Sequence, residues 1–180
     1  MNLDTTSLFV GPNERATISL LVNGETRTLD VEPQVALIDL LRDRLGLYGV
    51  KKGCDHGQCG ACTVLIDGRR VNACLVLAIM LEGAEVVTVE GLGAPGRLSP
   101  MQAAFVARDA FQCGYCTPGQ ICSATALVAE ARAMSGDEMA DDEIREAMSG
   151  NLCRCGAYPN ILAAIRDVLA SGRRAVEAAE

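Results

Sequence analysis

The residues of this sequence best suited to carry chemistry are its nine cysteines, in a chain of 180 residues. Four of them follow the spacing C-x4-C-x2-C-x11-C: Cys54, Cys59, Cys62 and Cys74. A tight triplet followed by a more distant cysteine is typical of a plant-type [2Fe–2S] cluster. Gly53, Gly57 and Gly60 would allow the backbone to curl closely around such a cluster. A structural zinc site, the alternative, usually shows two short cysteine pairs instead, so the spacing favours iron–sulfur ligation.

A second set of cysteines consists of a C-x2-C pair and a C-x-C pair: Cys113, Cys116, Cys153 and Cys155. Each pair lies at an expected helix–loop junction, so the two junctions could converge on one metal site. Helices beginning after Cys116 and Cys155 would turn their positive ends toward an anionic cluster. The spacing alone leaves zinc, a redox dithiol and an iron–sulfur cluster open. A Rieske centre is excluded because His56 is the only histidine.

The ninth cysteine, Cys122, lies on an expected helix outside both sets, and we expect it to be a small buried apolar residue. His56 is expected to face solvent in the first cysteine loop, with no catalytic role. Arg69 and Arg70 are expected at the surface of a turn.

The elements that would position these cysteines divide the chain into two halves of different class. Residues 17–22 and 26–31 are β-prone and flank Asn23–Gly24, which is a strong hairpin signal. A helical pattern of leucines over residues 37–45 is closed by Gly46, and strands are expected at 62–66, which ends in an Asp67–Gly68 turn, and at 85–89. The first half therefore predicts a mixed α and β domain.

The second half is predicted to be all helical. Ser99 is expected to cap a helix with Pro100 at its first position, continuing to Phe111. Further helices are expected at 118–134, at 141–148 with Asp141 as its cap, and at 159–169, which together suggest a compact four-helix bundle. The predicted fold class is α+β, with an N-terminal extension (1–15), a ferredoxin-like domain (16–91), a linker (92–98), a helical bundle (99–170) and a frayed C-terminal tail (171–180).

Charge and composition exclude several classes of partner. The formal net charge of −7 argues against nucleic acid and against an anionic membrane surface. No apolar run approaches the length of roughly 18 residues that a membrane span requires. The N-terminal residues show neither a secretory nor a twin-arginine signal, so a cytoplasmic location is expected. Structural disulfides are rare there, so nine cysteines point to metal.

Three segments together resemble a known family: GCDHGQCGACTVLIDGRRVNAC, QCGYCTPGQ and GNLCRCGAYPNI. They are similar to the small iron–sulfur subunit of molybdenum hydroxylases, a family that includes xanthine dehydrogenase, aldehyde oxidoreductase and carbon monoxide dehydrogenase. The resemblance runs from about Thr17 to Leu169 and includes all eight cysteines of the two sets. It implies an N-terminal β-grasp plant-type ferredoxin domain, an all-α four-helix bundle domain, and a [2Fe–2S] cluster in each.

The resemblance also implies a role in electron transfer. Electrons would pass from the molybdopterin cofactor of a large subunit through the helical-domain cluster and then the ferredoxin-domain cluster to FAD on a third subunit of a heterotrimer. Gln112 and Cys155 would lie at the pterin-facing surface, with Cys155 also a cluster ligand. The phrases GCDHGQCGAC, CTPGQICS and EIREAMSGN look most like the bacterial aldehyde-oxidising branch.

No substrate site and no catalytic residue are expected on this chain itself. One alternative is a free-standing two-cluster ferredoxin, and another is the same subunit in a xanthine, carbon monoxide or N-heterocycle dehydrogenase. A protein with structural metal staples is a third.

Overall fold

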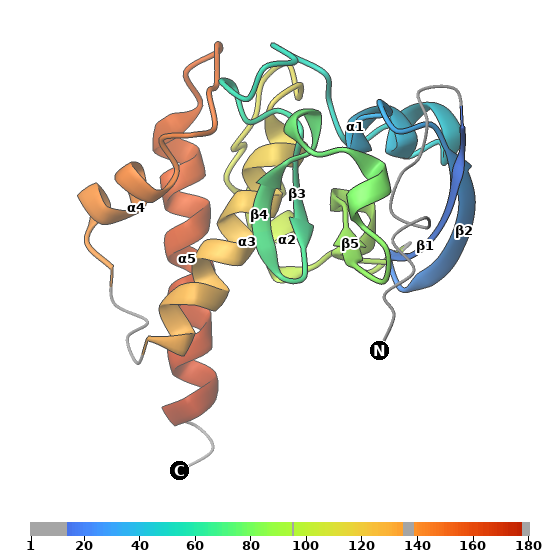
Figure 1. The fold of residues 1–180 in the computed structure, drawn as a ribbon. Helices are drawn as coiled ribbons and strands as arrows, with labels where there is room; N and C mark the ends of the chain where they lie inside the picture. The colour runs from blue at the N-terminus through green and yellow to red at the C-terminus, as the bar shows by residue number, and fades with distance from the viewer. Residues whose placement is uncertain (1–13, 95, 135–138, 178–180) are drawn as a thin grey trace.

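The first half of the chain folds around a five-stranded mixed sheet (Figure 1). The computed structural model describes residues 14–94, 96–134 and 139–177. Strands β1 and β5 pair in parallel and the other neighbours are antiparallel, in the order β2-β1-β5-β3-β4. The strands are β1 (Ala16–Val22), β2 (Glu25–Val31), β3 (Thr63–Ile66), β4 (Arg69–Asn72) and β5 (Glu85–Val87).

Two tight turns join the antiparallel hairpins as the sequence predicted. Asn23 and Gly24 have φ values of 50° and 83°, and Asp67 and Gly68 have 49° and 77°. Left-handed conformations at both central residues give a turn whose twist matches that of the flanking strands. The second hairpin leads into a short 3-10 turn, Ala73–Leu75. This turn contains Cys74, which is distant in the sequence from the other three cysteines of its set.

The leucine-rich segment of the first half is helical, but not as one regular α-helix. Helix α1 (Leu37–Asp39) continues into a π-helical turn at residues 40–44, where the Leu45 N–H donates to the Leu40 carbonyl five residues earlier. Gly46 follows with φ +69° and ends the segment. Leu37 and Leu41 are fully buried against the inner face of the sheet. The periodicity thus predicted the buried face correctly, whereas the widened turn left no signal in it.

The second half is helical, as predicted, with α2 (Pro100–Ala107), α3 (Thr117–Ala133), α4 (Asp141–Ala147) and α5 (Tyr158–Glu177). Ser99 caps α2: its Oγ accepts from the Gln102 N–H, and Gln102 Oε1 accepts from the Ser99 N–H. Helix α2 ends at Ala107, earlier than the expected Phe111, and Asp109 takes φ +47°. Helix α5 runs to Glu177, so the helix expected to end at Leu169 extends further. The finer description as a four-helix bundle stays a prediction.

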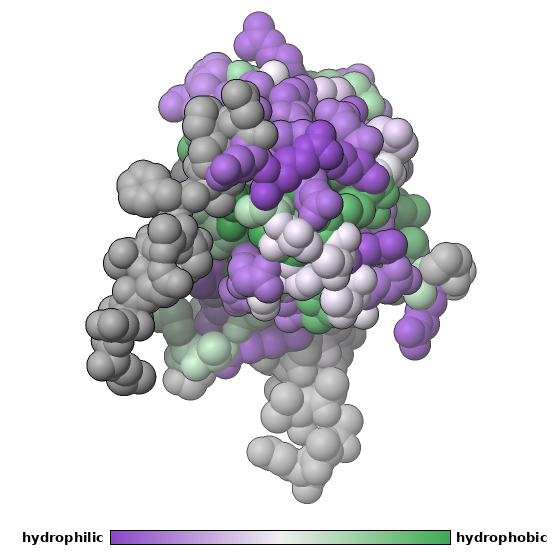
Figure 2. All heavy atoms as spheres, turned by 45° about the vertical axis from the view of Figure 1, so that its right-hand side comes forward, coloured by the Kyte–Doolittle hydropathy of each residue, from purple (hydrophilic) through white to green (hydrophobic). Residues whose placement is uncertain are grey.

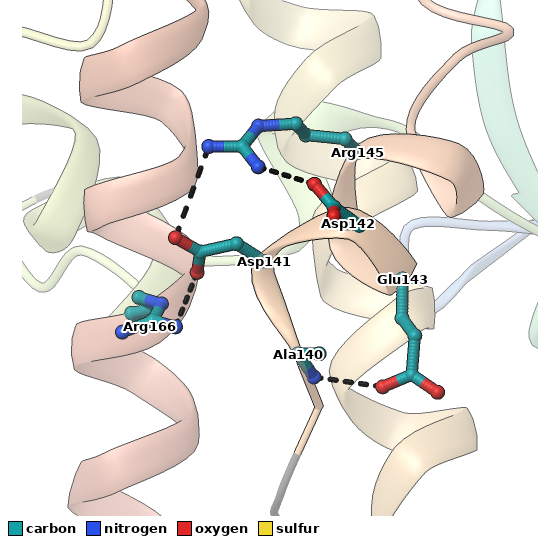
Figure 3. Close-up of polar contacts among 6 residues, drawn as sticks. All are labelled: Ala140, Asp141, Asp142, Glu143, Arg145 and Arg166. Carbon is teal, nitrogen blue, oxygen red and sulfur yellow. Dashed lines mark hydrogen bonds and ion pairs between the residues drawn. The ribbon is translucent and has the colours of Figure 1, made fainter.

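The start of α4 corrects the expectation that Asp141 caps it (Figure 3). The N-cap is Ala140, whose N–H donates to Glu143 Oε2 at 2.7 Å. Asp141 is the first helical residue, and its carboxylate pairs with Arg166 on α5 and with Arg145 on α4. An acidic residue in the first turn is favourable there, and this one also ties α4 to α5.

The two halves pack directly on each other, because helix α3 lies against strand β3. Cys122 and Ala126 of α3 meet Leu65 of β3 in a small apolar cluster, which confirms that Cys122 is a buried apolar residue. Arg70 was expected at a turn surface, but its guanidinium crosses to the helical half. It donates to the Ala147 carbonyl at 2.9 Å and to Glu130 Oε2 at 2.7 Å.

The outer surface seen with the sheet half turned forward is mostly hydrophilic, with hydrophobic side chains in small groups between the polar ones (Figure 2). Within the part of the chain that the structure describes, no helix combines the length and the apolar character needed to cross a membrane.

Candidate metal centres

The first cysteine set lies on the loop before β3 and on the turn after β4. The Gln58 N–H donates to Cys54 Sγ at 3.2 Å, and the Cys54 N–H donates to Cys59 Sγ at 3.4 Å. Asp55, Gly57 and Gly60 have φ values of 60°, 78° and 67°, so the loop curls through left-handed conformations. The curled backbone therefore points N–H groups at thiol sulfurs, which stabilises their anionic form.

The electrostatics of this set differ from one cysteine to the next. Backbone N–H groups, that of His56 first, lower the pKa of Cys54 to about 6. Burial raises the pKa of Cys62 to about 12, and the neighbouring Cys74 and Cys59 thiols add to the effect. Cys62 therefore lies near both Cys59 and Cys74, although Cys74 is distant in the sequence.

The second set gathers at the start of α3 and in the loop before α5. Hydrogen bonds from the Tyr115 backbone and with Cys155 lower the pKa of Cys113. Burial and hydrogen bonding with Cys153 raise the pKa of Cys116 to about 12. At Cys153, burial raises the pKa, but N–H donors led by Ala157 outweigh it and the net shift is downward. The pKa of Cys113 thus depends on Cys155, and that of Cys116 on Cys153.

The expected helix ends are placed only in part as predicted. Cys116 is the N-cap of α3, so that helix begins directly behind it. Helix α5 begins at Tyr158, and the loop residues 156–157 separate it from Cys155. The Tyr158 hydroxyl instead accepts from the Cys153 N–H at 2.8 Å.

Both sets border one cavity of about 400 Å³ between the halves, which also lies against Tyr115 and Leu152. The loops that carry the cysteines meet at the upper end of the molecule in Figure 1. Three hydrogen bonds between these loops are Leu152 N–H to the Cys59 carbonyl at 2.9 Å, Asn151 Nδ2 to the Gly60 carbonyl at 2.9 Å, and the Tyr115 hydroxyl to the Lys52 carbonyl at 2.7 Å. The cysteines that line the cavity come from both sets: Cys54, Cys59, Cys113, Cys116 and Cys153.

The second set extends from the interior to the surface, whereas the cysteines of the first set are buried or half-buried. Cys62 and Cys153 are buried, whereas Cys113 and Cys155 are exposed. Gln112 is exposed beside Cys113, and His56 is exposed in the first loop, as expected. The surface near Cys113 and Cys155 therefore offers the nearest access to the second set.

Asn151 and Gly119 are functional-site residues to which the sequence reasoning gave no role. Asn151 lies 7% exposed between the two cysteine loops. A Cβ on Gly119 would stand 2.2 Å from the Gly60 carbonyl oxygen, so only glycine allows α3 to approach the first loop. Gly119 lies in the cysteine segment QCGYCTPGQ, and Asn151 lies in GNLCRCGAYPNI. Their position close to the cysteines was the sequence signal that could have identified them.

The donor set fits [2Fe–2S] clusters. Thiols of each set interact in pairs, backbone N–H groups reach their sulfurs, and Thr117 Oγ1, beside Cys116, is buried without a hydrogen-bond partner among the described residues. In the described ranges no three His, Cys, Asp or Glu side chains form a group suited to one metal ion. A two-iron cluster spreads four thiolates over two irons, so three ligands need not meet at one point.

Comparison with known proteins agrees with this fit. Residues 20–87 match the family model of the 2Fe-2S iron-sulfur cluster binding domain, and residues 88–166 match that of a [2Fe-2S] binding domain. The aldehyde oxidoreductase iron-sulfur-binding subunit PaoA of Escherichia coli K12 is 59% identical over 160 residues, which cover 83% of this chain and 70% of the relative. The chain belongs to the iron–sulfur subunits of the molybdenum hydroxylases.

Other iron–sulfur subunits of this family serve different substrates. The nicotinate dehydrogenase small FeS subunit of Eubacterium barkeri is 45% identical over 152 residues, covering 84% of this chain and 94% of the relative. Quinoline 2-oxidoreductase from Pseudomonas putida 86 superposes with a TM-score of 0.82 at 43% identity, over 90% of this chain and 98% of that one. The aldehyde oxidoreductase of Desulfovibrio gigas superposes with a TM-score of 0.79 at 38% identity. The superposition covers 86% of this chain and 17% of that one.

Proposed function

We propose that this iron–sulfur subunit relays electrons from the molybdopterin centre of a large subunit, through two [2Fe–2S] clusters, to FAD on a further subunit. Cys54, Cys59, Cys62 and Cys74 would hold one cluster, and Cys113, Cys116, Cys153 and Cys155 the other. Such a cluster, when bound, accepts and releases one electron at a time. The chain's own residues position the thiolates, donate N–H groups to sulfur and exclude water, all of which tune the potentials.

The observation that carries this proposal is the shared cavity. Cysteines of both sets line it, and a hydrogen bond between Leu152 and Cys59 crosses from one set to the other. Two unrelated structural metal sites would have no need of this proximity, whereas electron transfer depends on it. The free-standing ferredoxin remains the alternative, but it gives the exposed Cys113 and Cys155 no partner.

The direction of the relay follows from the family resemblance and the exposure of the second set. Gln112 and Cys155 would face the pterin of the large subunit, and both are exposed. The domain boundaries (16–91, 92–98, 99–170 and 171–180), the bundle architecture of the helical half and the cytoplasmic location belong to the same proposal. Residues 1–13 of the expected N-terminal extension (1–15) lie outside the described residues.

The identity to PaoA supports an aldehyde as the substrate of the complex. A specific observation also favours a second candidate. Relatives named for nicotinate, nicotine and quinoline match at 43–45% identity, so an N-heterocycle dehydrogenase is the next substrate class to examine.

Purification of the tagged chain with its native partners tests the proposal. About four irons with matching labile sulfide per chain, together with co-purifying molybdenum and FAD, would support the relay. Aldehydes and N-heterocycles would then be compared as reductants of the complex. An iron-containing chain that stays alone and carries no molybdenum would favour the free ferredoxin and contradict the subunit role.

A further inference from the structure

Asn151 lies in the loop before α5, where the two cysteine sets approach each other. It connects this loop to the first cysteine loop, to strand β3 and to helix α3. Its Nδ2 donates to the Gly60 carbonyl at 2.9 Å and to Thr63 Oγ1 at 3.1 Å. Its Oδ1 accepts from Ser123 Oγ at 2.6 Å, and its carbonyl accepts from Gln120 Nε2 at 2.7 Å. Because the side chain is buried and both ends of its amide are bonded, its position is fixed.

The residue after Asn151 makes a direct bonded connection between the sets. The Leu152 N–H donates to the carbonyl of Cys59, a proposed ligand of the first cluster, at 2.9 Å. Leu152 is bonded in the chain to Cys153, a proposed ligand of the second cluster. One hydrogen bond and the backbone of one residue therefore separate a ligand of each cluster. A further crossing bond, from Tyr115 to Lys52, ends two residues before Cys54.

From these contacts we infer that Asn151 is a positioning residue, which holds the Leu152–Cys59 hydrogen bond through which the two clusters are electronically coupled. The inference rests on the proposed function. In the step it serves, one electron leaves one cluster and enters the other, so one is oxidised and the other reduced by one electron. No bond forms or breaks and no proton is required. Loss of the Asn151 amide would free the Leu152 loop from Gly60 and weaken the coupling.

The test uses the holo-complex reduced with dithionite and examined by low-temperature electron paramagnetic resonance. Two neighbouring reduced clusters split each other's signals when they are coupled. Asn151→Ala removes the positioning amide, and Leu152→Pro removes the N–H donor itself. Asn72→Ala is the matched control for the first, because Asn72 also bonds the first loop, through the Gly57 carbonyl, at 3.1 Å. Leu152→Ala keeps the N–H and is the control for the second.

We expect both test variants to keep the iron content and the two cluster signals, but to show a smaller splitting than the parent and the controls. The through-space dipolar part of the splitting remains, whereas the exchange part that depends on the bonded path is lost. Splitting that persists unchanged in Asn151→Ala and Leu152→Pro would overturn the inference. So would a parent with two cluster signals and no splitting, or an Asn151→Ala variant that loses the iron of one set. A parent complex that shows no pair of iron–sulfur signals would instead contradict the proposed function.

Discussion

Gly119 of helix α3 stands so close to Gly60 of the first cysteine loop that a Cβ on Gly119 would lie 2.2 Å from the Gly60 carbonyl oxygen. The same carbonyl accepts the hydrogen bond from Asn151 Nδ2, so it is held from two sides by the helical half. This contact brings the first cysteine set against the second. The closeness of the two proposed clusters therefore depends on the absence of a side chain at position 119 of α3.

Gly119→Ala should separate the halves at this contact. The added methyl group meets backbone atoms, which cannot move aside cheaply, so we expect a loss of about 1–3 kcal/mol in the free energy of unfolding. For a chain of this size each kcal/mol lowers Tm by about 2–4 °C, and thermal unfolding of the purified holo-protein measures it. Gly150→Ala is the control, because a Cβ there meets nothing within 4 Å. Equal Tm values for the two variants would show that the contact is not tight.

Replacement of single cysteines should divide the iron between the two sets. Cys62→Ala and Cys153→Ala should each lose about two of about four irons per chain, since each removes a ligand from one cluster. Cys122→Ala should keep all of them, because Cys122 lies in the apolar cluster between α3 and β3. Iron and labile sulfide assays on the purified variants decide the outcome. Iron lost from Cys122→Ala, or retained in full by Cys62→Ala, would contradict the assignment of ligands.

The curl of the first cysteine loop could be predicted from the sequence because it is set by local residues. The C-x4-C-x2-C loop must curl to bring its own thiols together, and the glycines that permit this are visible in the same segment. The hairpin turns were predicted for the same reason, since Asn23–Gly24 and Asp67–Gly68 adopt the left-handed conformations that their residue types favour.

Contacts between distant segments could not be predicted in this way. Arg70 reaches Ala147 and Glu130 across the interface, and no local pattern around Arg70 indicates a partner 60 or 77 residues away. The role of Asn151 likewise depends on how α3 packs against β3. The end of α5 was placed too early because the charged residues after Ser171 were taken as a tail, although residues of that kind are good helix formers.

Removal of the Arg70 guanidinium should weaken the interface modestly. The pair with Glu130 is half exposed, so solvent screening limits it to at most about 1 kcal/mol. The bond to the Ala147 carbonyl adds about 1 kcal/mol. Arg70→Gln should therefore lower Tm by a few degrees, whereas Arg69→Gln, at an exposed neighbouring position with the same charge change, should not. A similar fall in both variants would indicate a general charge effect instead of the bridge.

The buried thiol of Cys122 should make the stability of the chain depend on alkaline pH. Burial, with a smaller effect of Glu90, raises the pKa of Cys122 from 9.0 to about 12. Because the folded-state pKa exceeds the unfolded one, the stability contributed by the neutral thiol is fully present below about pH 9 and is lost as the pH rises toward 12. Folding should therefore become weaker over this window relative to a variant that lacks the thiol.

Cys122→Ala supplies that comparison. The difference in Tm between the parent and the variant should stay constant from pH 7 to about pH 9 and then shift in favour of the variant, since only the parent must keep a thiol protonated. Alkylation with iodoacetamide at pH 8, followed by peptide mass spectrometry, gives an independent reading. The thiolate is the reactive form, so Cys122 should be modified only after unfolding. Rapid modification of Cys122 in the folded protein would show that the thiol is accessible and that the packing of α3 on β3 is looser than the structure has it.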